Sequence, residues 1–210
     1  MLSLEMFQNR VMLDNPWWKT GRVLDDYISR RPRIQADSFY KQLCDDSLRR
    51  SFVVMGPRRV GKTWLIQHTV SRLMEDGHVS PANIFYFPID VPVYHGMGLE
   101  ELVYEAAKLA HVSPQRDRLY VFFDEVQYLK DWELHLKTVT DGYPNIRFAV
   151  SGSAASALRK GSIESGAGRF TDILLGPLSF YEYLDMSGFD TEGIKEMQNV
   201  FQDCQSLTSI

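Results

Sequence analysis

The stretch Phe52-Val53-Val54-Met55-Gly56-Pro57-Arg58-Arg59-Val60-Gly61-Lys62-Thr63 decides the fold of this chain. Its apolar beginning predicts a buried strand, and the residues that follow it, Trp64-Leu65-Ile66, begin a predicted helix. Between the two lies a loop with the spacing G-x-x-x-x-G-K-T. Gly56 and Gly61 permit backbone geometry that a Cβ atom excludes, so successive N–H groups can turn towards one point. Because the following helix adds its positive end there, the stretch predicts an anion-binding loop.

This loop carries the residue types that hold a nucleoside triphosphate. The spacing is that of the P-loop, or Walker A motif, in its required setting of strand, loop and helix. We expect Lys62 to reach the β- and γ-phosphates and the Thr63 hydroxyl to ligate Mg²⁺. The side chains of Arg58 and Arg59 are expected to point to solvent or to a partner. The predicted nucleotide-binding residues are Gly56, Pro57, Arg58, Arg59, Val60, Gly61, Lys62, Thr63 and Trp64.

A second apolar run ends in two acids. Leu119-Tyr120-Val121-Phe122-Phe123 is continuous, as expected of a strand buried on both faces of a sheet, and Asp124 and Glu125 follow it. Ligands of parallel α/β sheets bind at the carboxyl ends of the strands, so both acids are expected to face the loop. We expect Asp124 to hold the Mg²⁺ shell and Glu125 to polarise the attacking water. Together the two motifs favour a nucleotide site over a glycine-rich turn with an incidental Lys-Thr pair.

Two serines follow the next predicted strand, Arg147-Phe148-Ala149-Val150. A hydroxyl at this position can donate to the γ-phosphate or hold the attacking water. We expect Ser153 to be this catalytic sensor, with Ser151 as its rival. The alternative for Ser153 is an N-cap of a helix that begins at Ala154.

Arg169 and Gln127 are further candidates. Arg169 follows a glycine-rich loop and is a candidate catalytic arginine finger, acting on the site of its own chain or of a neighbouring subunit. Its alternative role is that of a solvated or salt-bridged side chain. Gln127 either bonds the attacking water, couples the site to Trp132, or simply starts a helix.

Composition limits the class of protein. With 210 residues and 44% hydrophobic content, the chain can bury one α/β core with a modest appendage. Its net charge of −4 gives no global reason to bind nucleic acid, although local basic patches stay open. Cys44 and Cys204 form no metal or redox spacing and are expected to be reduced thiols. No leader pattern and no apolar run of membrane-spanning length appears, so we expect a cytoplasmic protein with no membrane partner.

The chain divides into three predicted parts: an N-terminal helical arm (1–50), a P-loop core (51–185) and the start of a lid or C-terminal segment (186–210). Apolar spacing within the core predicts further helices at 62–75, 99–109, 132–139 and 179–184, and further strands at 83–88 and 173–175. Strands that alternate with helices of this length favour a parallel sheet with right-handed crossovers.

The arm carries two features of uncertain purpose. Trp17 and Trp18 either pack against the core or stack on adenine, and packing is favoured. The basic segment 30–33 has acidic neighbours, so we expect a solvated or interdomain surface rather than a DNA-binding site.

From Phe52 to Leu184 the chain resembles a family of prokaryotic AAA-type ATPases, close to the archaeal-ATPase and STAND branches of the P-loop superfamily. The resemblance implies an α/β three-layer sandwich of the P-loop NTPase type, a sheet in the order 5-1-4-3-2, and ATP rather than GTP. Such proteins usually continue into a helical lid or winged-helix segment and a C-terminal domain, so an end at Ile210 suggests a truncated chain or a minimal module. The matching stretches are 56–63, 122–127, 151–154, 164–169 and 177–184.

The sequence thus predicts an AAA-type, Mg²⁺-dependent ATPase. The alternative is a slow nucleotide-dependent switch, similar to STAND proteins, that binds ATP or ADP and signals to a partner. A GTPase is disfavoured because no Asn-Lys-x-Asp stretch is present, and a small-molecule kinase because it rarely needs an Asp-Glu pair at this strand end. A homo-oligomer or a protein partner is left open, as are the residues that contact adenine.

Overall fold

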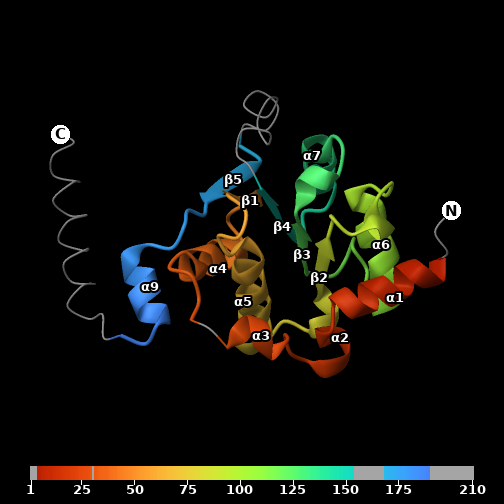
Figure 1. Cartoon of the computed structure of the whole chain (residues 1–210). Helices are drawn as coiled ribbons and strands as arrows, with labels where there is room; N and C mark the ends of the chain where they lie inside the picture. Colours follow the sequence, from red (N-terminus) through yellow and green to blue (C-terminus); the bar gives the residue numbers. More distant parts are fainter. Residues whose placement is uncertain (1–3, 30, 154–167, 190–210) are drawn as a thin grey trace.

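A five-stranded parallel sheet forms the centre of the molecule (Figure 1). The computed structural model describes residues 4–29, 31–153 and 168–189. Along the sheet the strands follow the order β2-β3-β4-β1-β5, which confirms the predicted order 5-1-4-3-2. All four neighbouring pairs run parallel. The strands are β1 (Ser51–Gly56), β2 (Ile84–Pro88), β3 (Leu119–Asp124), β4 (Ile146–Ser153) and β5 (Phe170–Leu174).

Helices cover both faces of the sheet, which gives the three-layer sandwich that the family resemblance implies. One layer comprises α1 (Leu4–Asp14), α6 (Leu99–Ala110) and α7 (Trp132–Gly142). The opposite layer comprises α4 (Ala36–Cys44) and α5 (Lys62–Glu75), with the short helices α2 (Trp17–Thr20) and α3 (Asp25–Ile28) beside them. A further helix, α9 (Phe180–Met186), follows β5.

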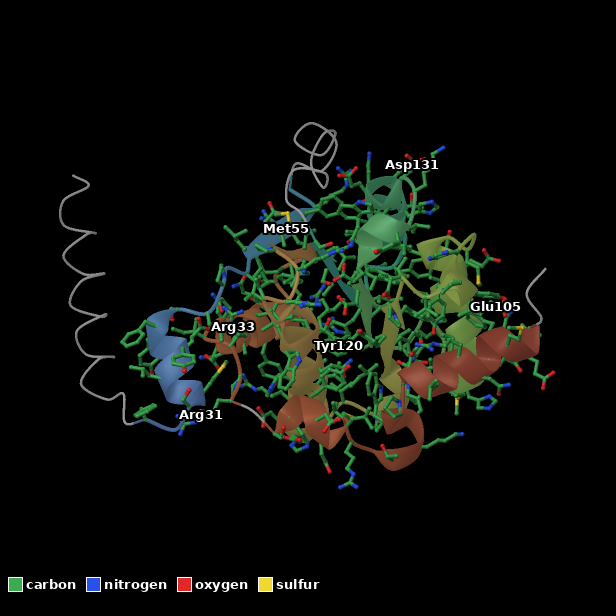
Figure 2. The ribbon with its side chains drawn as sticks, in the orientation of Figure 1. Arg31, Arg33, Met55, Glu105, Tyr120 and Asp131 are labelled. Carbon is green, nitrogen blue, oxygen red and sulfur yellow. The ribbon has the colours of Figure 1, made fainter. Side chains whose placement is uncertain are left out.

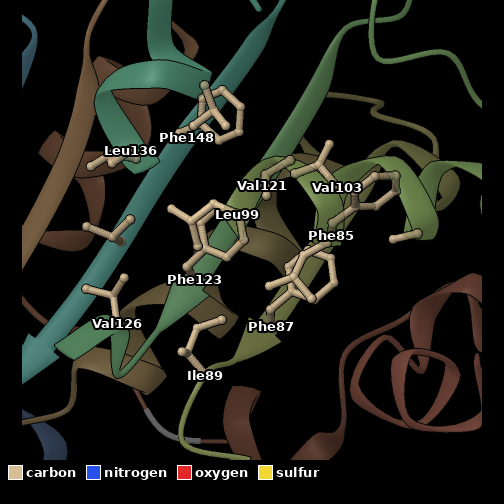
Figure 3. Packing of buried hydrophobic residues seen from close by; sticks show 14 of the residues in the cluster. Phe85, Phe87, Ile89, Leu99, Val103, Val121, Phe123, Val126, Leu136 and Phe148 are labelled. Carbon is tan, nitrogen blue, oxygen red and sulfur yellow. The ribbon is translucent and has the colours of Figure 1, made fainter. Parts of the chain in front are cut away.

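Successive residues of each strand belong alternately to two apolar clusters, one on each face of the sheet. Phe52 and Phe122 point towards α4 and α5, whereas Val121 and Phe123 point towards α6 and α7. Figure 3 shows the second cluster, in which the rings of Phe87 and Phe123 stack with their centroids 5.4 Å apart. Because the central strands are buried on both faces, their sequences are continuously apolar, and this made them predictable.

The N-terminal arm is built into the sandwich. The indole N–H groups of Trp17 and Trp18 both donate to the carbonyl oxygen of Ile84, at 3.0 and 2.9 Å. Asn15 accepts a hydrogen bond from the backbone N–H of Tyr86 and donates one to its carbonyl oxygen, at 2.7 and 3.0 Å. These bonds satisfy backbone groups on the outer edge of β2. They confirm the favoured prediction that the two tryptophans pack against the core.

The fifth strand differs from the prediction. It begins at Phe170, whereas its apolar part alone suggested 173–175. β5 lies at the edge of the sheet and is only partly buried, and the polar pair Thr171 and Asp172 interrupts its apolar residues. Such a half-exposed edge strand lacks the continuous apolar run of a central strand. The expected helix at Ala154, the stretch 164–167 and the segment from 190 onward lie outside the described residues.

Candidate functional site

The carboxyl ends of β1, β3 and β4 meet at one edge of the sheet, which we term the carboxyl edge. The predicted anion-binding loop leaves β1 there and enters α5. At Gly56 an added Cβ atom would lie 2.1 Å from the carbonyl oxygen of Leu175, so no other residue fits without movement of the backbone. Gly61 has φ +95°, in the region that glycine favours, and α5 begins directly after it. The loop therefore closes tightly around its own backbone and turns into the helix N-terminus.

Lys62 lies inside this loop. Its side chain is buried, and its ammonium group donates to the carbonyl oxygens of Gly56 and Pro57, at 3.2 and 3.0 Å. Its Nζ atom lies 3.9 Å from Oε1 of Glu125. Because neutral carbonyls are weaker acceptors for an ammonium than anionic oxygens, a phosphate in the loop would be the better partner.

Asp124 is the centre of a hydroxyl network. Its Oδ2 atom accepts hydrogen bonds from the Thr63 hydroxyl at 2.6 Å and the Tyr86 hydroxyl at 2.8 Å. Its Oδ1 atom accepts one from Ser151. Burial, and next the charge of Asp124, raise the pKa of Tyr86 well above its usual value, so this phenol stays a neutral donor. A carboxylate beside a threonine hydroxyl is an oxygen donor set of the kind that Mg²⁺ prefers.

Gln127 links the remaining polar residues. Its Nε2 atom donates to Oε2 of Glu125 at 2.5 Å and to the Ser153 hydroxyl at 2.8 Å. Its Oε1 atom accepts from the backbone N–H of Ser153 at 3.2 Å. Glu125 itself has φ +53°, a left-handed conformation that is uncommon outside glycine and that occurs often at functional sites. Of the alternatives for Gln127, the structure favours a role within the site, as the connection between Glu125 and Ser153.

The two serines therefore have different surroundings. Ser151 is fully buried and bonded to Asp124, so its hydroxyl positions that carboxylate. Ser153 reaches Glu125 through Gln127, and its hydroxyl is an acceptor in that bond. Its own proton has no acceptor among the described residues, so it can be donated to a ligand. The role of Ser153 as the sensor of the γ-phosphate therefore stays a prediction.

A cavity of about 460 Å³ adjoins the loop. This volume falls within the usual range for small-molecule sites, about 300–1,000 Å³. Tyr27 and Trp64 form one wall, with their rings in an edge-to-face arrangement 5.9 Å apart. Several segments enclose the cavity together: the arm, the loop with the start of α5, the end of β3 and the segment around α9. Its lining includes Arg31, Arg33, Val60, Lys62, Thr63, Glu125, Leu178 and Met186.

A buried ion pair beside the loop was not predicted. Arg33, expected at a solvated or interdomain surface, is almost fully buried and donates to Glu182 at 2.8 Å. It also donates to the carbonyl oxygens of Val60 and Gly176, so it joins the arm, the loop and α9. Figure 2 shows Arg31 and Arg33 between the arm and α9. The expectation of a solvated surface is therefore wrong for Arg33.

Glu182 is held by several donors at once. It accepts from Arg33 and from the backbone N–H groups of Ile34 and Ser179. Burial raises the pKa of Glu182, but the hydrogen bonds from Arg33, Ser179 and Ile34 outweigh it and leave that pKa at about 2. One sequence signal for this residue existed: Ser179 and Glu182 form the S-x-x-E capping box of α9. Nothing in the sequence, however, connected Glu182 with Arg33.

Arg169 lies away from the other predicted site residues. It directly precedes β5, and its carbonyl oxygen accepts from the N–H of Ser51, at the beginning of β1. The loop leaves the other end of β1, which is about 17 Å away for a strand of this length at about 3.3 Å per residue. Its guanidinium pairs with Asp141 at 2.8 Å. In this structure Arg169 does not reach the loop of its own chain, and the salt-bridge alternative is the one observed.

A family model described as an AAA domain matches residues 48–184, more than half of the chain. An uncharacterized protein of Methanocaldococcus jannaschii is 27% identical over 193 residues, which cover 91% of this chain and 41% of that protein. A second from the same organism is 24% identical over 190 residues, covering 88% of this chain and 38% of that protein. An uncharacterized protein of Haemophilus influenzae is 24% identical over 144 residues, covering 67% and 34%.

Solved structures also align with the chain. The structure of C. elegans PCH-2 matches with a TM-score of 0.47 and 16% identity, over 79% of this chain and 45% of that one. The chain spans 34–41% of the length of the uncharacterized relatives that it matches. In the described part of the chain, no helix has the length and apolar character that a membrane span requires.

Proposed function

The chain belongs to the AAA domain family, and from that premise we propose that it binds ATP with Mg²⁺ and hydrolyses ATP slowly. One observation carries the proposal: the Thr63 hydroxyl lies 2.6 Å from the Asp124 carboxylate, although the two residues are far apart in sequence. This bond joins the end of the anion-binding loop to the acid at the end of β3. Both motifs of a nucleoside-triphosphate site thus share one edge of the sheet.

The residues at this edge fit the ligands. The loop N–H groups and Lys62 supply positive charge for the phosphates, and the adjoining cavity has room for the nucleoside. Thr63 and Asp124 would hold Mg²⁺, which when bound neutralises charge on the β- and γ-phosphates. Gly56 keeps the loop close to the sheet because a side chain there would collide with Leu175.

Hydrolysis requires a base near the γ-phosphate, and Glu125 is placed for that task. Its carboxylate lies 3.9 Å from Lys62, the residue expected to reach that phosphate. Glu125 takes a proton from water as the water oxygen bonds to the γ-phosphorus. The bond from that phosphorus to the bridging oxygen breaks, and ADP and phosphate leave. Gln127 acts as a positioning residue, because it holds Glu125 and Ser153 in a fixed relation.

Slow turnover follows from the position of Arg169. An arginine that neutralises the transition state typically accelerates such reactions by about 10³–10⁵-fold. Arg169 lies at the other end of β1 and supplies no such charge to its own site. The same observation favours the second candidate function, a switch that keeps its nucleotide until a partner completes the site.

Phosphate release from Mg·ATP by the full chain, beside the variant Glu125→Gln, tests the proposal. We expect turnover that falls by about 10²-fold or more in the variant, the usual contribution of a general base, with ATP binding retained. Glu101→Gln, an exposed change on α6, is the matched control and should leave the rate unaltered. Absence of ATP binding in the unmodified chain would reject both functions, whereas binding without turnover would select the switch.

A further inference from the structure

The opposite edge of the sheet, which we term the amino edge, carries a row of arginines. Arg118 precedes β3, Arg147 lies at the start of β4, Arg50 precedes β1 and Arg169 precedes β5. Since β3, β4, β1 and β5 are neighbours, the four side chains follow one another across three strand spacings, about 14 Å at about 4.8 Å each. Arg49 and Arg116 lie next to this row in the chain, and both are exposed.

Acidic residues neutralise only part of this row. Asp46 pairs with Arg118 and Arg147, and Asp141 pairs with Arg169. Arg49, Arg50 and Arg116 have no carboxylate partner among the described residues. The edge therefore keeps an excess of positive charge, although the whole chain has a net charge of −4.

The row contains a preformed recess. A cavity of about 210 Å³ is lined by Arg49, Arg50 and Arg147, by the hydroxyl-bearing residues Ser51, Thr140 and Tyr143, and by one acid, Asp141, whose charge is paired with Arg169. Arg147 is 4% exposed, and its Nε atom has no hydrogen-bond partner among the described residues. A buried donor without an acceptor destabilises a fold. Because Arg147 lines the recess, an anionic oxygen bound there would be a suitable acceptor for its guanidinium group.

We propose that the amino edge binds the phosphodiester backbone of a nucleic acid, with one phosphate group seated in this recess. The recess is smaller than the sites of whole small-molecule ligands, so a single phosphate group fits where a complete nucleotide does not. Planar guanidinium groups match phosphate oxygens in pairs, and every cation in the row is arginine. The row spans about four base steps of about 3.4 Å, which suits a polymer of regularly spaced charges.

The proposal is tested by fluorescence anisotropy of labelled single-stranded DNA, and of the matching duplex, with the nucleotide-free full chain. Arg49→Ala/Arg50→Ala should weaken binding at least about tenfold. The slope of log affinity against log salt for single strands should fall by about 0.7, the contribution of the one phosphate contact that the recess provides. Lys130→Glu lowers the net charge by the same two units at an exposed position beyond the carboxyl end of β3 and should change neither quantity.

Three outcomes would overturn the proposal. Equal weakening in Arg49→Ala/Arg50→Ala and in Lys130→Glu would mean that only net charge matters. Displacement of DNA by a polyglutamate peptide at matched charge and salt would identify the row as a site for acidic protein segments. Binding of inorganic phosphate without binding of DNA would reduce the recess to a small-anion site. Because no ATP is present, each outcome is independent of the proposed ATPase activity.

Discussion

The two edges of the sheet differ in how their charged side chains are bonded. At the carboxyl edge the charged groups are bonded within the site: Lys62 to loop carbonyls, Asp124 to three hydroxyls and Glu125 to Gln127. At the amino edge, Arg49 and Arg50 are exposed and lack carboxylate partners among the described residues. A bonded network fixes geometry before a ligand arrives, whereas exposed charges act through a field that salt screens. The first arrangement suits chemistry, and the second suits reversible attachment.

The largest effect should come from Lys62→Ala at the carboxyl edge. Loss of the buried ammonium should weaken ATP binding by about a hundredfold or more, or about 2.8 kcal/mol at about 1.4 kcal/mol per tenfold change. Arg50→Ala removes the same charge from the amino edge and should leave ATP binding unchanged. Titration calorimetry with Mg·ATP measures both affinities, and circular dichroism checks that both variants fold. Equal losses would show that the edges are not functionally separate.

Arg33→Met should have the next largest effect, on stability. Breaking a buried ion pair on one side leaves the other charge uncompensated, which costs about 3–5 kcal/mol. Arg31→Met removes an exposed pair with Asp185 and should cost at most about 1 kcal/mol. Denaturant unfolding of both variants at neutral pH provides the comparison. If the two variants are equally stable, the bonds by which Arg33 joins the arm, the loop and α9 do not contribute to the stability of the fold.

The same pair should show in the pH dependence of stability. The pKa of Glu182 is about 2 in the folded chain, below its ordinary value of 4.5. A lowered carboxyl pKa contributes stability that is present above pH 4.5 and is lost as the pH falls from there towards 2. The stability difference between the unmodified chain and Arg33→Met should therefore shrink over that range. A constant difference across these pH values would contradict the assignment.

Gln127→Leu should act on the rate alone. Without the bonds to Glu125 and Ser153 the base is held less firmly, so kcat should fall about tenfold, or about 1.4 kcal/mol in the barrier. The nucleotide contacts expected of Lys62 and Thr63 are unaffected, so KM should stay the same. Steady-state kinetics separate the two constants. A higher KM with an unchanged kcat would show that Gln127 contributes to binding instead.

How far the sequence predicts this molecule depends on whether a feature is local. The buried strands β1 and β3 and the motifs at their ends lie in single continuous stretches, so strand, loop and acids were predicted together. The hydrogen bond from Tyr86 to Asp124 was not predicted. Tyr86 lies on a neighbouring strand, and the sequence of that strand indicates only that its residues are buried. Arg33 was assigned to a surface because acidic residues lie near its segment in the sequence, whereas its actual partner, Glu182, is distant in sequence.

The smallest effect should come from Arg169→Ala, which tests whether the edges ever meet. Arg169 and Asp141 are exposed, so their pair contributes at most about 1 kcal/mol, and turnover of the dilute chain should be unchanged. Lys41→Ala, which breaks another exposed pair, is the control.

The informative measurement is specific activity against protein concentration. A rise in the unmodified chain that is absent in Arg169→Ala would place the amino edge of one chain at the carboxyl edge of the next, with Arg169 acting on its neighbour's nucleotide. Slower turnover of the dilute variant would instead contradict the separation of the edges, because Arg169 and the loop of its own chain lie at opposite ends of β1.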